Sequence, residues 1–191
     1  MNTKLNIHAV IPSSRVNGPG ARLVVFFQGC GRACPGCFNP ETHSFGEREA
    51  LLVDEIFKRL PKGQAEGITV SGGEPFAQKE GLSLLLKGAR ERALSTVVYT
   101  GFTIEELNKD EAAREALIYI DVLVDGPFIE QEKETTLLAR GSSNQRLHFL
   151  TNRYTEEDFI MEGKVEVIIK ADGAVVETGF SRAPLRAGLG R

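Results

Sequence analysis

The sequence has no apolar run long enough to cross a lipid bilayer, and its first residues lead into no signal-peptide core. It also has no excess of basic charge, because 23 basic and 26 acidic residues leave a formal net charge of −3. We therefore expect neither a membrane segment nor a nucleic-acid partner. A chain of 191 residues, 41% of them hydrophobic, is long enough for one substantial domain and a small appendage.

Cysteine is equally scarce, and its few copies are clustered. The three cysteines, Cys30, Cys34 and Cys37, lie within eight residues of one another. An odd number of cysteines with such short loops between them makes a poor disulfide framework. We expect thiols that are reserved for a metal, in a protein of the reducing cytoplasm.

The spacing of these cysteines is C-x3-C-x2-C, which offers three thiolates to one metal centre and no fourth. A cubane of four irons held in this way keeps one iron open to a further ligand, whereas a closed structural site normally has four protein ligands. The alternative is a structural zinc site in which His43 is the fourth ligand, in a C-x3-C-x2-C-x5-H arrangement.

Strand-like and helix-like patterns alternate along the first two thirds of the chain. Short apolar runs predict strands over 23–27, 68–70, 96–99 and 121–125. Helical spacing of apolar residues predicts helices over 52–60, before Pro61, and over 82–93, and a capping box predicts a third helix from Thr103. The β-α-β-α-β order indicates an α/β fold, as a parallel sheet or an open barrel with right-handed crossovers.

The C-terminal part of the sequence has a different pattern. Residues 165–170 and 174–178 alternate around Asp172–Gly173, which is a strong hairpin signal. The segment 181–191 has three arginines and no acidic residue, and we expect it to be disordered. We therefore divide the chain into a domain over 1–150, a hairpin extension over 151–180 and a tail over 181–191.

The unusual sequences of the first part follow the carboxyl ends of the predicted strands, where ligands gather in such folds. The cysteine segment follows 23–27, and the Ser71–Pro75 turn follows 68–70. Thr100–Gly101 and Asp125 stand at the next two ends, although Asp125 is also suited to cap the following turn. The glycines at 72 and 73 lack side chains, so that backbone can approach a ligand closely. The sequence therefore predicts one site at this rim.

Together, Cys30-x3-Cys34-x2-Cys37 and Gly72-Gly73-Glu74-Pro75 resemble the radical S-adenosylmethionine superfamily. Within it, the chain is most similar to the activating enzymes of anaerobic (class III) ribonucleoside-triphosphate reductase. The blocks that carry this resemblance span about 16–148 and are 16–20, 34–37, 39–42, 71–73, 99–101, 121–126 and 140–145.

The resemblance implies one 4Fe-4S cluster on Cys30, Cys34 and Cys37, with S-adenosylmethionine on the open iron. Reductive cleavage of this cofactor would give methionine and a 5′-deoxyadenosyl radical, with no catalytic residue beyond cluster and cofactor. Phe38 would pack on the adenine, and the Gly72–Gly73 turn would accept hydrogen bonds from the methionine ammonium group. The implied cofactor-binding residues are Gly36, Phe38, Ser71, Gly72, Gly73, Glu74 and Thr100.

The resemblance also implies an anaerobic oxidoreductase that makes a glycyl radical on a protein partner, anaerobic ribonucleotide reductase, with a flavodoxin-type electron donor. The implied fold is a partial open (β/α) barrel of mostly parallel strands, to which the C-terminal β-hairpin is added. Two alternatives stay open at this point. One is a radical enzyme that acts on a small molecule and resembles carboxy-deazaguanine synthase, and the other is a non-catalytic iron–sulfur or zinc-binding module.

Overall fold

The computed structural model of the chain describes residues 3–61, 63, 65–134, 138–160, 165–169 and 175–179. Within these residues the main sheet has seven strands: β1 (Lys4–Ser14), β2 (Arg22–Phe27), β3 (Glu49–Leu52), β4 (Gly67–Gly72), β5 (Ser95–Tyr99), β6 (Val122–Asp125) and β7 (Arg146–Phe149). The α-helices of the same part are α1 (Val53–Phe57), α2 (Lys79–Glu91), α3 (Ile104–Leu107) and α4 (Glu111–Leu117). Short 3-10 helices lie at Pro40–Thr42, Pro75–Gln78, Glu130–Glu132 and Glu156–Phe159.

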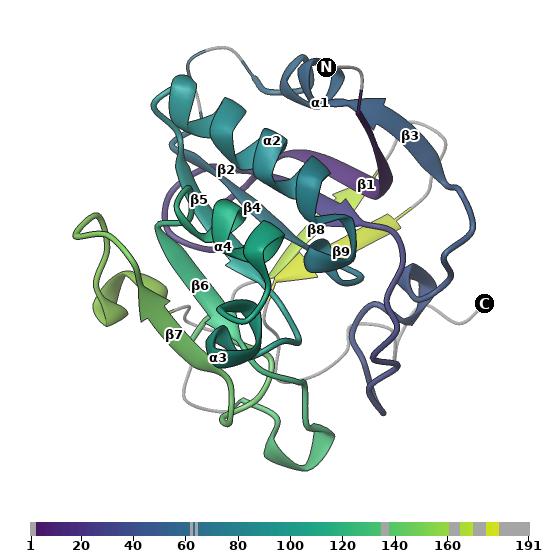
Figure 1. Ribbon diagram of the computed structural model, residues 1–191, viewed down its shortest axis with the longest axis vertical. Coiled ribbons are helices and arrows are strands. Elements are labelled where there is room, and N and C mark those ends of the chain that lie inside the picture. Colours follow the sequence, from purple (N-terminus) through teal and green to yellow (C-terminus); the bar gives the residue numbers. More distant parts are fainter. Residues whose placement is uncertain are drawn as a thin grey trace.

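The strand order of the main sheet is β3-β1-β2-β4-β5-β6-β7 (Figure 1). The four central strands β2, β4, β5 and β6 run parallel, and β1, β3 and β7 are antiparallel to their neighbours. The expected parallel arrangement is therefore present in the centre of a mixed α/β sheet and not at its edges. Because β2, β4, β5 and β6 share one direction, the segments that follow them begin at the same edge of the sheet.

All four strands predicted in the first part of the chain are present, and none of their ends differs from the prediction by more than two residues. The sequence reasoning missed β1, β3 and β7. Pro12 interrupts the reading of β1 as a strand, although Leu5 and Ile7 are buried there and alternate with more exposed residues. The other two strands have only four residues each and contribute to the sheet through partners far away in the sequence.

The helix predicted over 52–60 is wrong in its extent. Glu49–Leu52 forms β3, in which Leu52 lies opposite Lys4 of β1, and α1 covers only Val53–Phe57. The apolar spacing in this region combines the last residue of a strand with one turn and a half of helix. Strand pairing with β1 takes Leu52, which the sequence pattern assigns to the helix.

The apolar face predicted for α2 is confirmed at Leu82, Leu85, Leu86 and Ala89, all of which are buried in the main core. It is wrong at Ala93, which is exposed and lies beyond the end of the helix with a φ of +58°. The next residue donates its N–H to the carbonyl oxygen of Ala89 at 3.0 Å, as in a Schellman motif. The third predicted helix begins as expected, because the Thr103 hydroxyl accepts a hydrogen bond from the N–H of Glu106.

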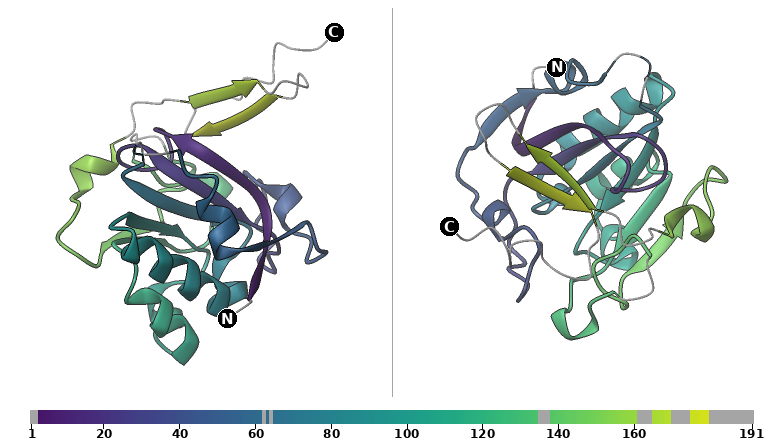
Figure 2. Two further views of the ribbon diagram at one scale, coloured as in Figure 1. Left: turned by 90° about the horizontal axis from the view of Figure 1, so that it is seen from above. Right: turned by 180° about the vertical axis from the view of Figure 1, so that it is seen from behind.

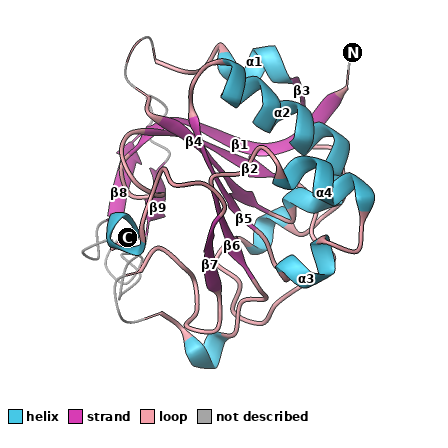
Figure 3. Cartoon of the chain, turned by 60° about the vertical axis from the view of Figure 1, so that its left-hand side comes forward, coloured by secondary structure: helices cyan, strands magenta, loops and turns pink. Residues whose placement is uncertain are grey.

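The helices α1 to α4 lie on one face of the main sheet (Figure 3). The core between them and the sheet contains most of the buried apolar side chains. A second cluster lies on the opposite face, where Val97 and Val122 pack against Ala139 and Phe159. Packing onto the sheet therefore continues past residue 150, where we placed the boundary of the first domain.

Strands β8 (Val165–Ile169) and β9 (Val175–Gly179) form a separate antiparallel pair. Figure 2 shows this pair beside β1, on the side of the sheet away from the helices. The Arg15 N–H donates a 2.8 Å hydrogen bond to Glu166 Oε1 and joins the two parts. The predicted Asp172–Gly173 turn and the tail over 181–191 lie outside the described residues, so both stay predictions. No helix in the described part of the chain is both long and apolar enough to cross a membrane.

Candidate metal centre

The cysteine loop, residues 29–43, leaves the carboxyl end of β2 and returns to the same place. At its base, the Gly29 N–H donates to the Thr42 carbonyl oxygen at 2.8 Å. Next to this contact, the Cys30 N–H donates to the His43 carbonyl oxygen at 3.1 Å. The first cysteine therefore stands at the point where main-chain hydrogen bonds close the loop.

The Gly72–Gly73 turn follows β4 and packs against the end of β2. Gly73 and Glu74 donate their N–H groups to the carbonyl oxygens of Phe27 and Gly29, each at 2.8 Å. A Cβ on Gly72, where φ is +104°, would lie 2.5 Å from the Phe27 nitrogen, and one on Gly73 would overlap the Gly29 carbonyl oxygen. Glycine is needed at both positions because two backbones approach closely there. Contact of this turn with a ligand stays a prediction.

The three cysteines are free thiols of intermediate exposure. The Cys37 N–H donates to the Cys34 carbonyl oxygen at 3.2 Å, and the Asn39 N–H donates to Cys37 Sγ at 3.5 Å. Burial raises the pKa of the Cys37 thiol, the Asn39 N–H lowers it, and the charges of Cys34 and Cys30 raise it further. The three sulfurs therefore interact electrostatically, and a cation bound by them would favour their thiolate forms.

The backbone of the loop bends sharply between the cysteines. Ala33 has a φ of +45° and Gly36 a φ of +67°, both in the left-handed region. At Gly36 a Cβ would overlap the carboxylate of Glu130, which lies in the segment after β6. Gly36 is therefore favoured by its left-handed backbone, whereas the exposed Glu130 carboxylate can move aside, and contact of Gly36 with a cofactor stays a prediction.

The donor chemistry of the loop fits an iron–sulfur cluster, because three thiols lie on one short stretch and such clusters take cysteine thiolates. Among the described residues, no group of three or more His, Cys, Asp or Glu side chains stands in a metal-binding arrangement. His43 does not complete a Cys3His zinc set with the three cysteines in the described part of the chain.

Glu74 is almost fully buried, with 3% of its surface exposed. Its carboxylate accepts hydrogen bonds from the Thr100 hydroxyl and the Gly101 N–H, both at 2.8 Å, and from the Phe76 N–H at 3.0 Å. Burial raises the pKa of the Glu74 carboxyl, and these hydrogen bonds counteract it only in part. Glu74 and Thr100 are therefore bound to each other across the ends of β4 and β5.

Two further predicted cofactor residues, Ser71 and Phe38, lie on other segments than the Glu74–Thr100 hydrogen bond. Ser71 stands in β4 opposite Phe26 of β2. Phe38, 53% exposed, packs on Phe128 with a ring-centroid distance of 4.9 Å, and Lys133 Nζ lies 5.2 Å from the centre of its ring. The structure thus brings the Gly-Gly-Glu turn and Thr100 together, and it places Phe38 against the segment after β6.

The sequence of the chain is similar to those of known proteins. Residues 16–148 match the family model of a 4Fe-4S single cluster domain. The chain is 36% identical over 155 residues to the anaerobic ribonucleoside-triphosphate reductase-activating protein of Escherichia coli (strain K12), a match that covers 76% of this chain and 99% of that protein. The proteins of the same name from Haemophilus influenzae and Enterobacteria phage T4 are 34% and 32% identical, over 75% and 81% of this chain and 97% and 100% of their own lengths.

The chain belongs to the family of anaerobic ribonucleoside-triphosphate reductase-activating proteins. The span of the family model contains the cysteine loop, the Gly72–Gly73 turn and the ends of all the central strands. Strands β8 and β9 lie after the end of that span.

Arg32 lies at the candidate site, and the sequence reasoning did not single it out. It stands between the first two cysteines, and its guanidinium carbon lies 4.2 Å from the centre of the Phe102 ring. Its Nη2 atom lies 3.3 Å from Glu106 Oε2, 74 residues away in the sequence. No local pattern indicates this contact, because it depends on the approach of the cysteine loop to the end of β5.

Asp125 lies at the carboxyl end of β6 and contacts two neighbouring elements. It is fully buried, accepts a 2.7 Å hydrogen bond from the Ile104 N–H, pairs with Arg146 at 2.6 Å, and lies 3.1 Å from His148 Nε2. Burial alone would raise the pKa of Asp125, but the hydrogen bonds from Arg146 and Ile104 outweigh it and hold that pKa below its ordinary value. Asp125 therefore bonds the first turn of α3, which precedes it in the sequence, and joins β6 to β7, whereas the sequence suggested a cap on the turn that follows it.

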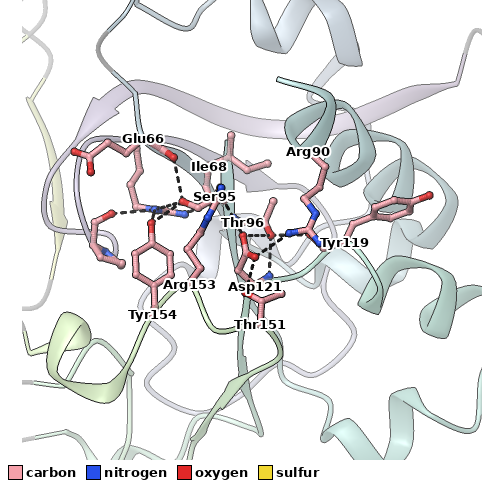
Figure 4. Close-up of polar contacts among 12 residues, drawn as sticks. Glu66, Ile68, Arg90, Ser95, Thr96, Tyr119, Asp121, Thr151, Arg153 and Tyr154 are labelled. Atoms are coloured by element: carbon pink, nitrogen blue, oxygen red, sulfur yellow. Dashed lines mark hydrogen bonds and ion pairs between the residues drawn. The ribbon is translucent and has the colours of Figure 1, made fainter. Parts of the chain in front are cut away.

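A second group of charged side chains lies at the opposite edge of the sheet, near the amino ends of the strands. Buried Arg22 donates to the Ser95 hydroxyl at 3.0 Å and to the Tyr154 hydroxyl at 3.4 Å. Buried Asp121 pairs with Arg90 at 2.9 Å, in the arrangement that Figure 4 shows beside Ser95 and Tyr154. The hydrogen-bonding groups of these buried charged side chains are thus paired within the protein.

Proposed function

We propose that this protein is a radical S-adenosylmethionine activating enzyme that generates a glycyl radical on anaerobic ribonucleoside-triphosphate reductase. The observation that carries the proposal is the position of Cys30, Cys34 and Cys37 on one loop, whose base is hydrogen-bonded to the end of β4. The relatives support the partner, because they are named as activating proteins of that reductase.

In this proposal Cys30, Cys34 and Cys37 hold a single 4Fe-4S cluster through their thiolates. When bound, cluster and cofactor supply the reductive cleavage of S-adenosylmethionine to methionine and a 5′-deoxyadenosyl radical, which takes a hydrogen from the partner's glycine. The chain itself binds and orients. The Asn39 N–H holds the Cys37 sulfur by a 3.5 Å contact, and the loop base holds Cys30 beside the Gly72–Gly73 turn.

The residues that we propose for contact with S-adenosylmethionine are Gly36, Phe38, Ser71, Gly72, Gly73, Glu74 and Thr100. Among them, Phe38 offers a half-exposed ring on which an adenine can stack. Glu74 and Thr100 hold the ends of β4 and β5 together through their 2.8 Å hydrogen bond. Their part in the proposal is therefore to fix the rim against which the cofactor lies.

The remaining parts of the proposal concern the fold and the electron source. The parallel strands β2, β4, β5 and β6 would act as the wall of a partial open barrel, with β8 and β9 as the added hairpin. A flavodoxin-type protein would supply the electron, because one cluster cannot provide its own low-potential electron. Free thiols of intermediate exposure, reserved for a cluster, are suited to a reducing, anaerobic cytoplasm.

The experiment is anaerobic reconstitution with iron and sulfide, followed by electron paramagnetic resonance of the reduced protein with and without S-adenosylmethionine. We expect a 4Fe-4S signal that changes when S-adenosylmethionine is added. On addition of the anaerobic reductase, we expect release of 5′-deoxyadenosine and a glycyl-radical signal on the reductase. A cluster that is indifferent to S-adenosylmethionine would rule out the radical chemistry.

Matched variants separate the remaining hypotheses. Cys34→Ala should lose the cluster, whereas His43→Ala should keep it, because the proposal uses three thiolates and no imidazole. Loss of metal in both variants, with zinc in the isolated wild type, would instead indicate a structural zinc site. Release of 5′-deoxyadenosine with no radical on the reductase would favour a radical enzyme with a small-molecule substrate.

A further inference from the structure

The cysteine loop is held at its base and at its outer part, but its first interval is not held by main-chain hydrogen bonds. The base bonds end at Cys30, and the next main-chain bond inside the loop joins the Cys37 N–H to the Cys34 carbonyl oxygen. Within the described residues, no main-chain hydrogen bond involves residues 31–33. The spacing of the first two cysteines therefore depends on side-chain contacts.

Two side chains lie at this interval: Phe45 is close to Gly29 and Gly31, and Arg32 reaches out of the loop. Its guanidinium group stacks over Phe102 at 4.2 Å, and its Nη2 atom pairs with Glu106 at 3.3 Å. The aliphatic part of the side chain crosses Gly101, where a Cβ would overlap Arg32 Cδ. Arg32 thus reaches from the cysteine loop over the turn between β5 and α3.

The partners of Arg32 are themselves fixed. The Glu106 carboxylate accepts a 2.7 Å hydrogen bond from the Thr103 N–H, and the Thr103 hydroxyl accepts one from the Glu106 N–H at 3.2 Å. This capping box holds the first turn of α3. The Gly101 N–H is bonded to the buried Glu74 carboxylate at 2.8 Å, which fixes the preceding turn. Arg32 therefore ties the interval 31–33, which has no main-chain hydrogen bonds in the described structure, to the first turn of α3.

The residue after Arg32 has an unusual backbone conformation. Ala33 has a φ of +45°, in the left-handed region where a Cβ meets the following carbonyl oxygen. The other described non-glycine residue with positive φ is Ala93, where main-chain hydrogen bonds at the end of α2 support the bend. Ala33 has no such support in the described structure, and conformations of this kind persist only where the surroundings hold them.

We infer that Arg32 is a positioning residue that holds the left-handed bend at Ala33 and thereby sets the separation of Cys30 and Cys34 for cluster binding. The inference rests on the cluster of the proposed function, but its first link, from the side chain of Arg32 to the backbone of Ala33, is independent of any metal. The chain provides a matched control, because Arg92 stacks over Phe57 at 4.3 Å and pairs with Asp54 at 3.3 Å, away from the cysteines.

The cluster test compares the wild type, Arg32→Ala, Arg92→Ala and the double variant Arg32→Ala with Ala33→Gly. Each is reconstituted anaerobically, and the rate of iron loss to a chelator is measured by absorbance. We expect Arg32→Ala to lose iron faster by on the order of tenfold, as residues that orient metal ligands do, and Arg92→Ala to match the wild type. Glycine adopts the left-handed conformation readily, so the double variant should recover most of the retention. Equal rates in all variants, or no recovery in the double variant, would overturn the inference.

The second test uses the metal-free full-length protein and nuclear magnetic resonance. The Cα and Cβ shifts and the HN–Hα coupling of Ala33 report its φ. We expect left-handed values in the wild type and in Arg92→Ala, and their loss in Arg32→Ala. Unchanged values in Arg32→Ala would overturn the inference. The two tests can also give different answers. If the Ala33 signals change in Arg32→Ala but the wild type binds no cluster, the link between Arg32 and Ala33 is supported, whereas the proposed function and the role in cluster binding are refuted.

Discussion

The carboxylate of Glu74 and the hydroxyl of Thr100 meet at 2.8 Å, across the carboxyl ends of the neighbouring strands β4 and β5. The same carboxylate accepts hydrogen bonds from the N–H groups of Phe76 and Gly101. Only 3% of Glu74 is exposed, so these protein donors take the place of water. Two residues that are predicted to contact a cofactor thus form a structural tie of the rim.

Glu74→Gln should destabilise the protein by about 2 kcal/mol, because one of the three buried donors would then face the side-chain NH2 group. The measurement is the free energy of unfolding in urea at neutral pH. Glu115→Gln, an exposed substitution on α4, is the control and should change the free energy by less than about 0.5 kcal/mol. Equal losses in the two variants would contradict the structural role of Glu74.

Gly73→Ala should cost about 3 kcal/mol of folding free energy, because its Cβ would overlap the Gly29 carbonyl oxygen and push the cysteine loop from the end of β4. The comparison is Gly63→Ala, where φ is +70° and no atom lies within 4 Å of the added Cβ. That variant should cost only about 1 kcal/mol, from the left-handed backbone alone. Chemical denaturation of both variants tests the difference, and a smaller loss at Gly73 than at Gly63 would show that the turn is not tightly packed.

Glu105 should give the protein a pH-dependent contribution to stability. The hydrogen bonds from Arg146 lower the pKa of Glu105 from 4.5 to about 2. A folded-state pKa below the unfolded value contributes stability above pH 4.5, and this contribution is lost as the pH falls towards 2. The difference in unfolding free energy between the wild type and Glu105→Gln should therefore shrink over this range. Because both side chains are exposed, added salt should also reduce it, and a difference that grows towards acid would contradict the pairing.

Tyr154→Phe should destabilise the fold by about 1 kcal/mol, because the Tyr154 hydroxyl bonds to the Ser95 hydroxyl at 2.8 Å and to buried Arg22. The control is Tyr119→Phe, since Figure 4 shows the Tyr119 ring pointing away from this network. Thermal unfolding should give a lower midpoint for the Tyr154 variant than for the control. Equal midpoints would show that the hydrogen bonds of the Tyr154 hydroxyl to Ser95 and Arg22 do not contribute to stability.

The central strands could be predicted because each is a short apolar run buried on both faces, a pattern that is visible within five or six residues. The edges of the sheet could not be predicted in the same way. Leu52 continues an apolar helical pattern, yet it pairs with Lys4 as a strand because β1 has a free edge there. The four residues of β7 pair with β6 along the backbone, and the side chain of Arg146 adds an ion pair with the buried Asp125.

The candidate site likewise has features that the sequence predicts and contacts that only the tertiary structure shows. The spacing of Cys30, Cys34 and Cys37, the two glycines of the turn and the capping box at Thr103 are local patterns, and the sequence by itself determines them together with the family to which they belong. Only the tertiary structure decides that Glu74 bonds to Thr100 and that Arg32 reaches Phe102. These contacts join segments that are distant in the sequence and depend on which strand ends are neighbours. Strand order is set by packing of the whole sheet, which no local spacing of residues encodes.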